Sequence, residues 1–145
     1  MNLIKIIISA FIMFSALQST AQSNYLKDME SAKMISKDVA QLFKENKINE
    51  ALIKIKKYWP IADSELDNLE SKTIEAMKVV AERFGNSEGI VKVSEHNIKE
   101  TAFKETYLVK YEKTAIRLIF IYYKNNKGWI INAFKWDDNF KEEFK

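Results

Sequence analysis

The sequence predicts an α+β domain in which helices come first and a four-stranded antiparallel sheet follows. Up to Phe84 the apolar residues recur every three or four positions, which is the period of an amphipathic helix. After Gly89 the period falls to two, which is typical of strands with one buried face. The run Asn125-Asn126-Lys127-Gly128 is a strong turn signal and predicts that the last two strands form a hairpin.

Three helices are predicted before Gly85. The first spans residues 24–47, the second is shorter and is ended by Pro60, and the third ends at Gly85, where a positive φ suits glycine. The candidate N-cap residues are Ser23 or Asn24, Asn49, and Asp63 or Ser64. Each helix carries one apolar stripe, so all three are expected to pack on a single face of the sheet.

Four strands are predicted over residues 90–93 (continuing irregularly towards 101), 103–111, 115–123 and 129–136. A tight turn near Lys113-Thr114 places two apolar sets on one face of the sheet. This face is expected to take the helices, and its members are Tyr107, Val109, Tyr111, Ile116, Leu118, Phe120 and Tyr122.

The third strand is apolar on its second face as well. Ile119, Ile121 and Tyr123 lie there next to Leu108, where an ordinary one-sided sheet is polar. A homodimer partner, a fold of the tail or a bound apolar ligand is expected to cover this face. The alternative is that a central strand tolerates a few exposed apolar residues.

Residues 1–21 have the organisation of a secretory signal peptide. Lys5 supplies the positive start, residues 6–17 (IIISAFIMFSAL) the apolar run, and Ser19 and Ala21 the small residues before a cleavage site. A spanning helix needs about 20 apolar residues, so we expect cleavage and no stable membrane anchor. The expected product is one α+β domain over residues 22–145, exported to a periplasm or secreted.

Composition excludes several classes of function. The chain has no cysteine, so neither disulfides nor cysteine-bound zinc can hold it. The first 21 residues carry one lysine and no acid, so cleavage lowers the formal net charge from +3 to +2. Only Arg83 and Arg117 offer the forked guanidinium that reads phosphates and base edges, which argues against nucleic-acid binding.

The segment from Phe84-Gly85 to Trp136 resembles the cystatin-like, nuclear transport factor 2-like α+β roll. The resemblance is clearest in the last strand, Gly128-Trp129-Ile130-Ile131-Asn132-Ala133-Phe134-Lys135-Trp136, and is closest to small exported bacterial domains of unknown function. It implies a curved sheet around a long helix, often with a pocket between them, and often dimerisation through the sheet. It implies no activity, because this fold hosts enzymes, binders and scaffolds alike.

Two residues are candidates for acid–base catalysis. Glu105 shares strand parity with Phe103 and Tyr107, so it is expected to point inward, where a carboxylate can serve as a general base or pair with a lysine. His96 is the only histidine and lies in the polar run Ser94-Glu95-His96-Asn97, so an exposed position is the alternative.

Five aromatic residues are candidates for lining an apolar ligand pocket, with core packing as the alternative. They are Tyr122, Tyr123, Trp129, Phe134 and Trp136. Asp137-Asp138, with Glu142 and Glu143, lack the ordered spacing of a calcium loop, so a solvated tail is expected and no metal or cofactor is predicted.

The sequence therefore favours an exported, non-catalytic binding or interaction module, self-associating through its sheet or holding a small apolar ligand. The alternative is a small pocket enzyme of isomerase or dehydratase type that uses Glu105 or His96. A structural envelope protein is a third hypothesis.

Overall fold

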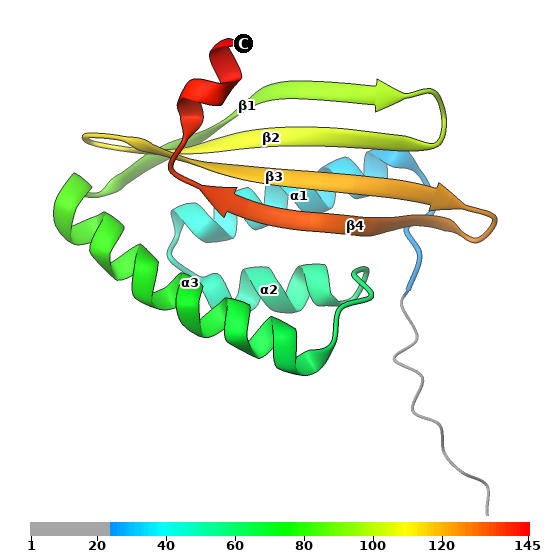
Figure 1. Ribbon diagram of the computed structural model, residues 1–145, viewed down its shortest axis with the longest axis horizontal. Helices are drawn as coiled ribbons and strands as arrows, with labels where there is room; N and C mark the ends of the chain where they lie inside the picture. The colour runs from blue at the N-terminus through cyan, green and yellow to red at the C-terminus, as the bar shows by residue number, and fades with distance from the viewer. Residues whose placement is uncertain (1–23) are drawn as a thin grey trace, which may run out of the picture.

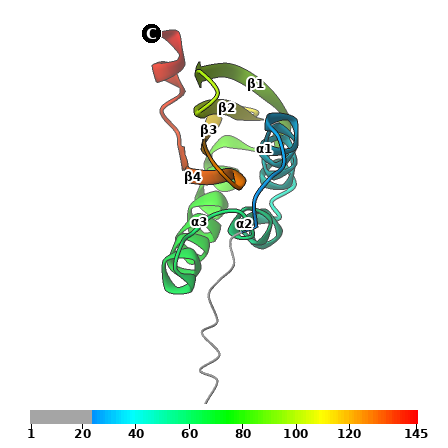
Figure 2. The same ribbon diagram turned by 90° about the vertical axis from the view of Figure 1, so that its right-hand side faces the viewer.

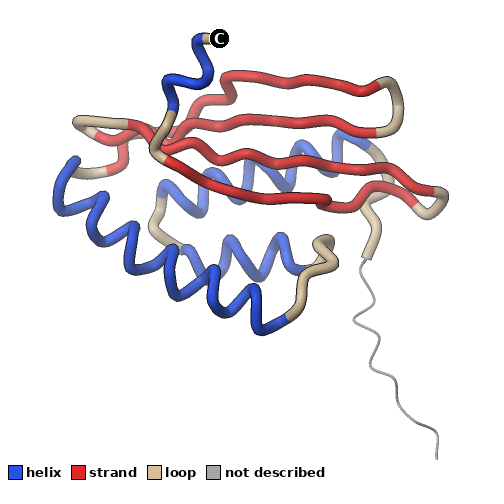
Figure 3. Tube along the Cα trace, viewed as in Figure 1, coloured by secondary structure: helices blue, strands red, loops and turns tan. Residues whose placement is uncertain are grey.

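Three helices lie on one side of a four-stranded antiparallel sheet in a computed structural model that describes residues 24–145 (Figure 1). The helices are α1 (Met29–Lys44), α2 (Ile48–Lys56) and α3 (Asp63–Phe84). The strands are β1 (Ser87–Ile98), β2 (Ala102–Tyr111), β3 (Ala115–Asn125) and β4 (Gly128–Asp137), and they lie in sequence order. Figure 3 shows α2 and α3 below the sheet and α1 behind its lower strands. The predicted α+β architecture is confirmed.

The first helix begins later than predicted. Asp28 is its N-cap, and its carboxylate accepts a hydrogen bond from the Ser31 N–H at 2.8 Å, which lowers the pKa of Asp28. Among residues 24–27, Leu26 forms a bridge with Trp129 at the edge of β4 through two backbone hydrogen bonds of 2.8 Å. The prediction of a helix from residue 24 was wrong, because α1 begins at Met29 and Leu26 uses its backbone to pair with Trp129 instead.

The predicted caps of the other two helices were also wrong. Neither α2 nor α3 has a side-chain N-cap, and the Asn49 amide instead donates to Glu70 of α3 at 2.8 Å. Gly85 does end α3 with a φ of 85°, as predicted. A Cβ at Gly85 would also lie 2.5 Å from the Glu112 carboxylate, which would have to move, but the positive φ is what favours glycine there.

The core lies between α1 and the inner face of the sheet, defined here as the face that carries Leu118 and Tyr122. Figure 2 shows β1 and β2 arching over α1. Phe103 stacks on Tyr122 with ring centroids 4.6 Å apart, and Trp129 meets Phe103 edge-on at 5.2 Å. The buried Tyr122 hydroxyl donates to the Ala32 carbonyl at 3.0 Å and lies 2.8 Å from the Ser36 hydroxyl. These bonds satisfy the polar atoms that this aromatic packing would otherwise leave unpaired.

The tail forms a short 3₁₀ helix, η1 (Phe140–Phe144), on the outer face, which is the opposite side of the sheet from α1 (Figure 2). Arg117 of β3 holds it there. The Arg117 guanidinium donates to both oxygens of Asp137 at 2.9 and 2.7 Å and to Glu143 at 2.8 Å. The tail therefore covers part of the outer face, which was one of the predicted alternatives. The contacts that hold it there are the ion pairs of Arg117 and not apolar packing.

Leu118 gives a test of which face is core. It is fully buried on the inner face, so Leu118→Ala is expected to lower the free energy of unfolding by about 2–5 kcal/mol through lost burial and the cavity left behind. Val79→Ala, at an exposed position of α3, is the matched control and is expected to change it by less than about 0.5 kcal/mol. Urea unfolding measures both, and a Leu118→Ala effect as small as that of the control would contradict the face assignment.

Candidate functional site

Glu105 and His96 lie on opposite faces of the sheet. Glu105 points inward and is fully buried, whereas His96 is exposed on the outer face, opposite Lys104 in the register. The inward direction predicted for Glu105 is confirmed. The two candidate acid–base groups cannot act on one substrate from these positions.

Glu105 belongs to a chain of alternating charges between the inner face and α1. The Lys92 ammonium bonds to Glu105 Oε1 at 2.8 Å and also to Glu95, and Glu95 in turn pairs with Lys33 of α1 at 3.0 Å. We call Lys33, Glu95, Lys92 and Glu105 the inner charge network. The other Glu105 oxygen, Oε2, is buried and has no hydrogen-bond partner among the described residues.

The contacts within this network shift the pKa values of its members. Hydrogen bonds from Lys92 and Lys33 lower the pKa of Glu95 from 4.5 to about 2. Burial opposes the charge on Lys92, but its bonds to Glu105 and Glu95 outweigh burial and raise its pKa. The hydrogen bond to Glu95 raises the pKa of Lys33. At neutral pH these contacts therefore favour the charged forms of Lys33, Lys92 and Glu95.

Glu105 is absent from the lining of four surface hollows formed by residues 24–145. Its surroundings are packed side chains, including Tyr107, whose pKa burial raises. The arrangement therefore holds a carboxylate in place and does not present it to a substrate.

Four of the five aromatic candidates face inward. Tyr122, Trp129 and Phe134 are buried in the core. Trp136 is half-buried, and its indole N–H donates to the Thr73 hydroxyl of α3 at 3.0 Å. Their role as ligand contacts stays a prediction. In this structure Tyr122 and Trp129 pack on Phe103, and Phe134 packs on Phe43 of α1 and Phe120 of β3.

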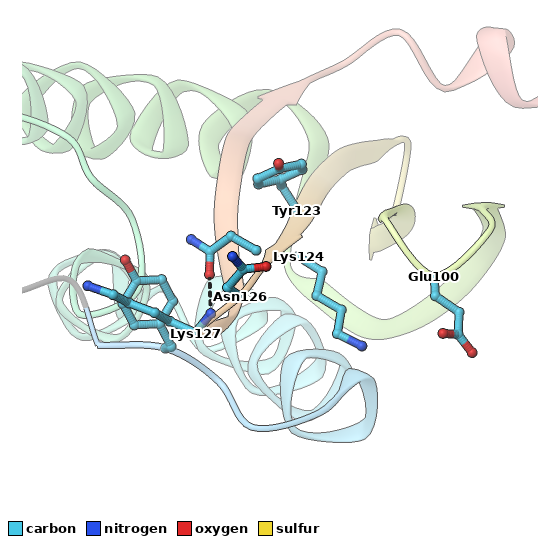
Figure 4. Close-up of a pocket in the computed structure, with 7 residues that line it drawn as sticks. Glu100, Tyr123, Lys124, Asn126 and Lys127 are labelled. Carbon is cyan, nitrogen blue, oxygen red and sulfur yellow. Dashed lines mark hydrogen bonds between the residues drawn. The ribbon is translucent and has the colours of Figure 1, made fainter.

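Tyr123 differs from the other aromatic candidates, because it is 43% exposed on the outer face. It lines an open hollow of about 560 Å³ at the β3–β4 turn, together with Glu100, Lys124 and Lys127. Figure 4 shows these side chains spread apart around the turn, with Glu100 well away from Lys127. No set of polar groups converges there, so this hollow is a weak candidate for a site.

A second hollow, of about 660 Å³, lies on the outer face beside η1, and we call it the outer-face hollow. Ile119 and Ile121 of β3 line it, with Lys104 of β2 on one side of them and Lys135 of β4 on the other. His96 also lines it, with Glu142 and Glu143 of η1 and Lys145 directly after it. The outer-face hollow therefore combines two aliphatic side chains of β3 with several charged groups.

The charges contributed by the tail are already paired. Glu143 bonds to Arg117 and accepts from the Ser94 hydroxyl at 3.1 Å, and Glu142 pairs with Lys145 at 2.7 Å. By contrast, neither Lys104 nor Lys135 has an acidic partner within 4 Å in the described chain. Sequence reasoning found the apolar face of β3 but missed these lysines, because isolated alternating lysines are what any solvated strand face carries.

Metal and membrane features are not found over residues 24–145. No group of three or more His, Asp or Glu side chains is placed to hold a metal ion there. No helix in this range is long and apolar enough to cross a membrane. The predicted signal peptide lies outside the described residues.

The inner charge network predicts a large effect for one lysine. Lys92→Met leaves the buried Glu105 carboxylate without a cation and is expected to destabilise the fold by about 3 kcal/mol. The double variant Lys92→Met/Glu105→Leu removes that charge as well and is expected to recover most of the loss. Urea unfolding of the three chains measures this, and a Lys92→Met chain as stable as the wild type would show that the network adds nothing.

Glu95 predicts a pH dependence. Its folded pKa lies below its ordinary value, so the stabilisation is present above about pH 4.5 and is lost as the pH falls towards about 2. Glu95→Gln is expected to cost about 1 kcal/mol at pH 7, because water screens a partly exposed pair, and almost nothing at pH 2. Unfolding at several pH values measures the difference, with Glu88→Gln on the same strand as the control. A difference that does not change with pH would contradict the assignment.

Comparison with models of protein families, with curated proteins and with solved structures finds no match to this chain. The resemblance to the cystatin-like, nuclear transport factor 2-like roll therefore stays a prediction, and the α+β architecture is the level at which the fold is established.

Proposed function

We propose that this chain is an exported, non-catalytic binding module that holds a small ligand in the outer-face hollow. The observation that carries the proposal is the pairing of an apolar floor with two lysines that lack acidic partners. A volume of about 660 Å³ is within the usual range for small-molecule sites. Export rests on the sequence of residues 1–21.

Binding is favoured over catalysis by the surroundings of the two acid–base candidates. Glu105 is tied to Lys92 and lies in none of the hollows described above. His96 lines the outer-face hollow but makes no hydrogen bond to an acidic or nucleophilic side chain in the described chain. General acid–base catalysis needs such a group within reach of a substrate and held in orientation, so the pocket enzyme is the weaker alternative.

A small ligand is also favoured over a second copy packed face to face. A symmetric dimer through this face would bring Lys104 and Lys135 of one copy towards those of the other, which costs free energy unless anions intervene. The η1 helix also stands on this face and would have to be accommodated (Figure 1). Self-association through the face is one outcome of the test below.

Ile121→Lys tests the proposal. Ile121 is half-buried on the outer face, so the variant is expected to fold and to lose the bound molecule, because the new ammonium group occupies the apolar floor. Val79→Lys, on the far side of the molecule, is the control and is expected to keep it. Native mass spectrometry of each chain, purified from its own secretory compartment, measures the mass of any complex.

The wild-type spectrum decides between the alternatives. A reproducible small extra mass that Ile121→Lys removes and Val79→Lys retains would support the proposal. A dimer that Ile121→Lys splits would replace it with self-association through the outer face. A wild-type chain of bare monomer mass, also after incubation with small amphiphiles, would contradict both.

A further inference from the structure

The lysines of the outer-face hollow stand on both sides of its apolar floor. Lys104 is the register partner of Ile121, and Lys135 is the register partner of Ile119. Their strands are two spacings apart, about 10 Å, and the two positions are offset by two residues along β3, about 7 Å, so their backbones lie about 12 Å apart on a diagonal. Long lysine side chains from these positions can reach one group that lies above β3.

The local charge is positive once the existing ion pairs are counted. Arg117 is neutralised by Asp137 and Glu143, and Lys145 by Glu142. Lys104 and Lys135 remain, and among residues 24–145 neither has an acidic side chain within 4 Å. Asp137 and Glu143 together exceed the charge of Arg117 by one, so the four basic and three acidic side chains around the hollow sum to +1. A net positive site beside an apolar strip is complementary to an anion that also has an apolar part.

Apolar side chains continue along the outer face from the hollow in one direction only, and the apolar part of a ligand can lie over them. At the η1 end the floor stops at the Arg117 ion pairs, which are polar. In the other direction the next row of the sheet aligns Ile98, Ala102 and Tyr123. Ile98 is 69% exposed, so this row is apolar surface in contact with water.

We infer that the ligand of the outer-face hollow is a fatty-acid-type carboxylate. Its carboxylate lies between Lys104 and Lys135, and its hydrocarbon chain runs over Ile121 towards Tyr123. This inference rests on the proposed function and narrows it to one chemical class. Burial of the chain supplies the apolar part of the affinity, and the two ammonium groups select the anion.

Decanoate and decanol, both used below the concentrations at which they aggregate, separate the two contributions. The wild-type protein is expected to bind decanoate about tenfold more tightly than decanol, because hydrogen bonds to charged groups add this much. Titration calorimetry measures the affinities, and NMR shifts of Ile119 and Ile121 report the place of binding. The preference is expected to shrink as salt is added.

The lysines are tested with Lys104→Met/Lys135→Met, which keeps the apolar stems. This double variant is expected to bind decanoate about tenfold more weakly and decanol unchanged. Lys110→Met, exposed on the same strand and outside the hollow, is the control and is expected to change neither affinity. If the double variant does not fold, Lys135→Gln alone is expected to weaken decanoate binding and leave decanol binding intact.

The outcomes separate the inference from the function on which it rests. Decanoate and decanol bound equally at Ile119 and Ile121, with no effect of the lysine variants, would overturn the fatty-acid assignment and leave the binding module standing. If neither compound binds at these residues, the outer-face hollow is not a site for apolar ligands, and both proposals fail.

Discussion

The two-sided burial of β3 is the constraint on which the rest of the structure depends. Every residue from Ala115 to Phe120 is buried, so this strand needs cover on both faces of the sheet. The helices supply it on the inner face, with Leu118 and Phe120 in the core. On the outer face η1 supplies it at one end only, through the ion pairs of Arg117. The outer-face hollow is what remains where that cover ends.

Much of the fold follows from periodicity, because helices and strands bury different sets of positions in the sequence. The turn at Lys113-Thr114 fixed the parity between β2 and β3, and with it the inward direction of Glu105. The start of α1 did not follow, since Leu26 continues the apolar stripe of the helix and yet pairs with Trp129 through its backbone. A bridge of one residue is too short to produce the alternating hydrophobic pattern by which a strand is predicted.

The inner charge network could not be predicted for a related reason. Lys92 and Glu95 are three residues apart, so strict alternation would place them on opposite faces of β1. The register of β1 shifts between Lys92 and Ser94, and this bulge brings both side chains to the inner face beside Glu105. The anchor formed by Glu143 was hidden too, because an acidic tail has the composition of a solvated one. Both sets of contacts therefore depend on local features, a β-bulge and a docked tail, that have no recognisable signal in the sequence.

The pairing of Leu26 with Trp129 has a consequence for the behaviour of the protein at high concentration. An exposed strand edge is a template on which another chain can add a strand and begin to aggregate. On the β4 side, Leu26 and the Tyr58 carbonyl already take backbone groups of Trp129 and Ile131. On the β1 side, the bulge and the inward charges of Lys92 and Glu95 disfavour a flat incoming strand. The sheet is thus limited to four strands at both edges, which protects from aggregation a chain that has no disulfide to lock its fold.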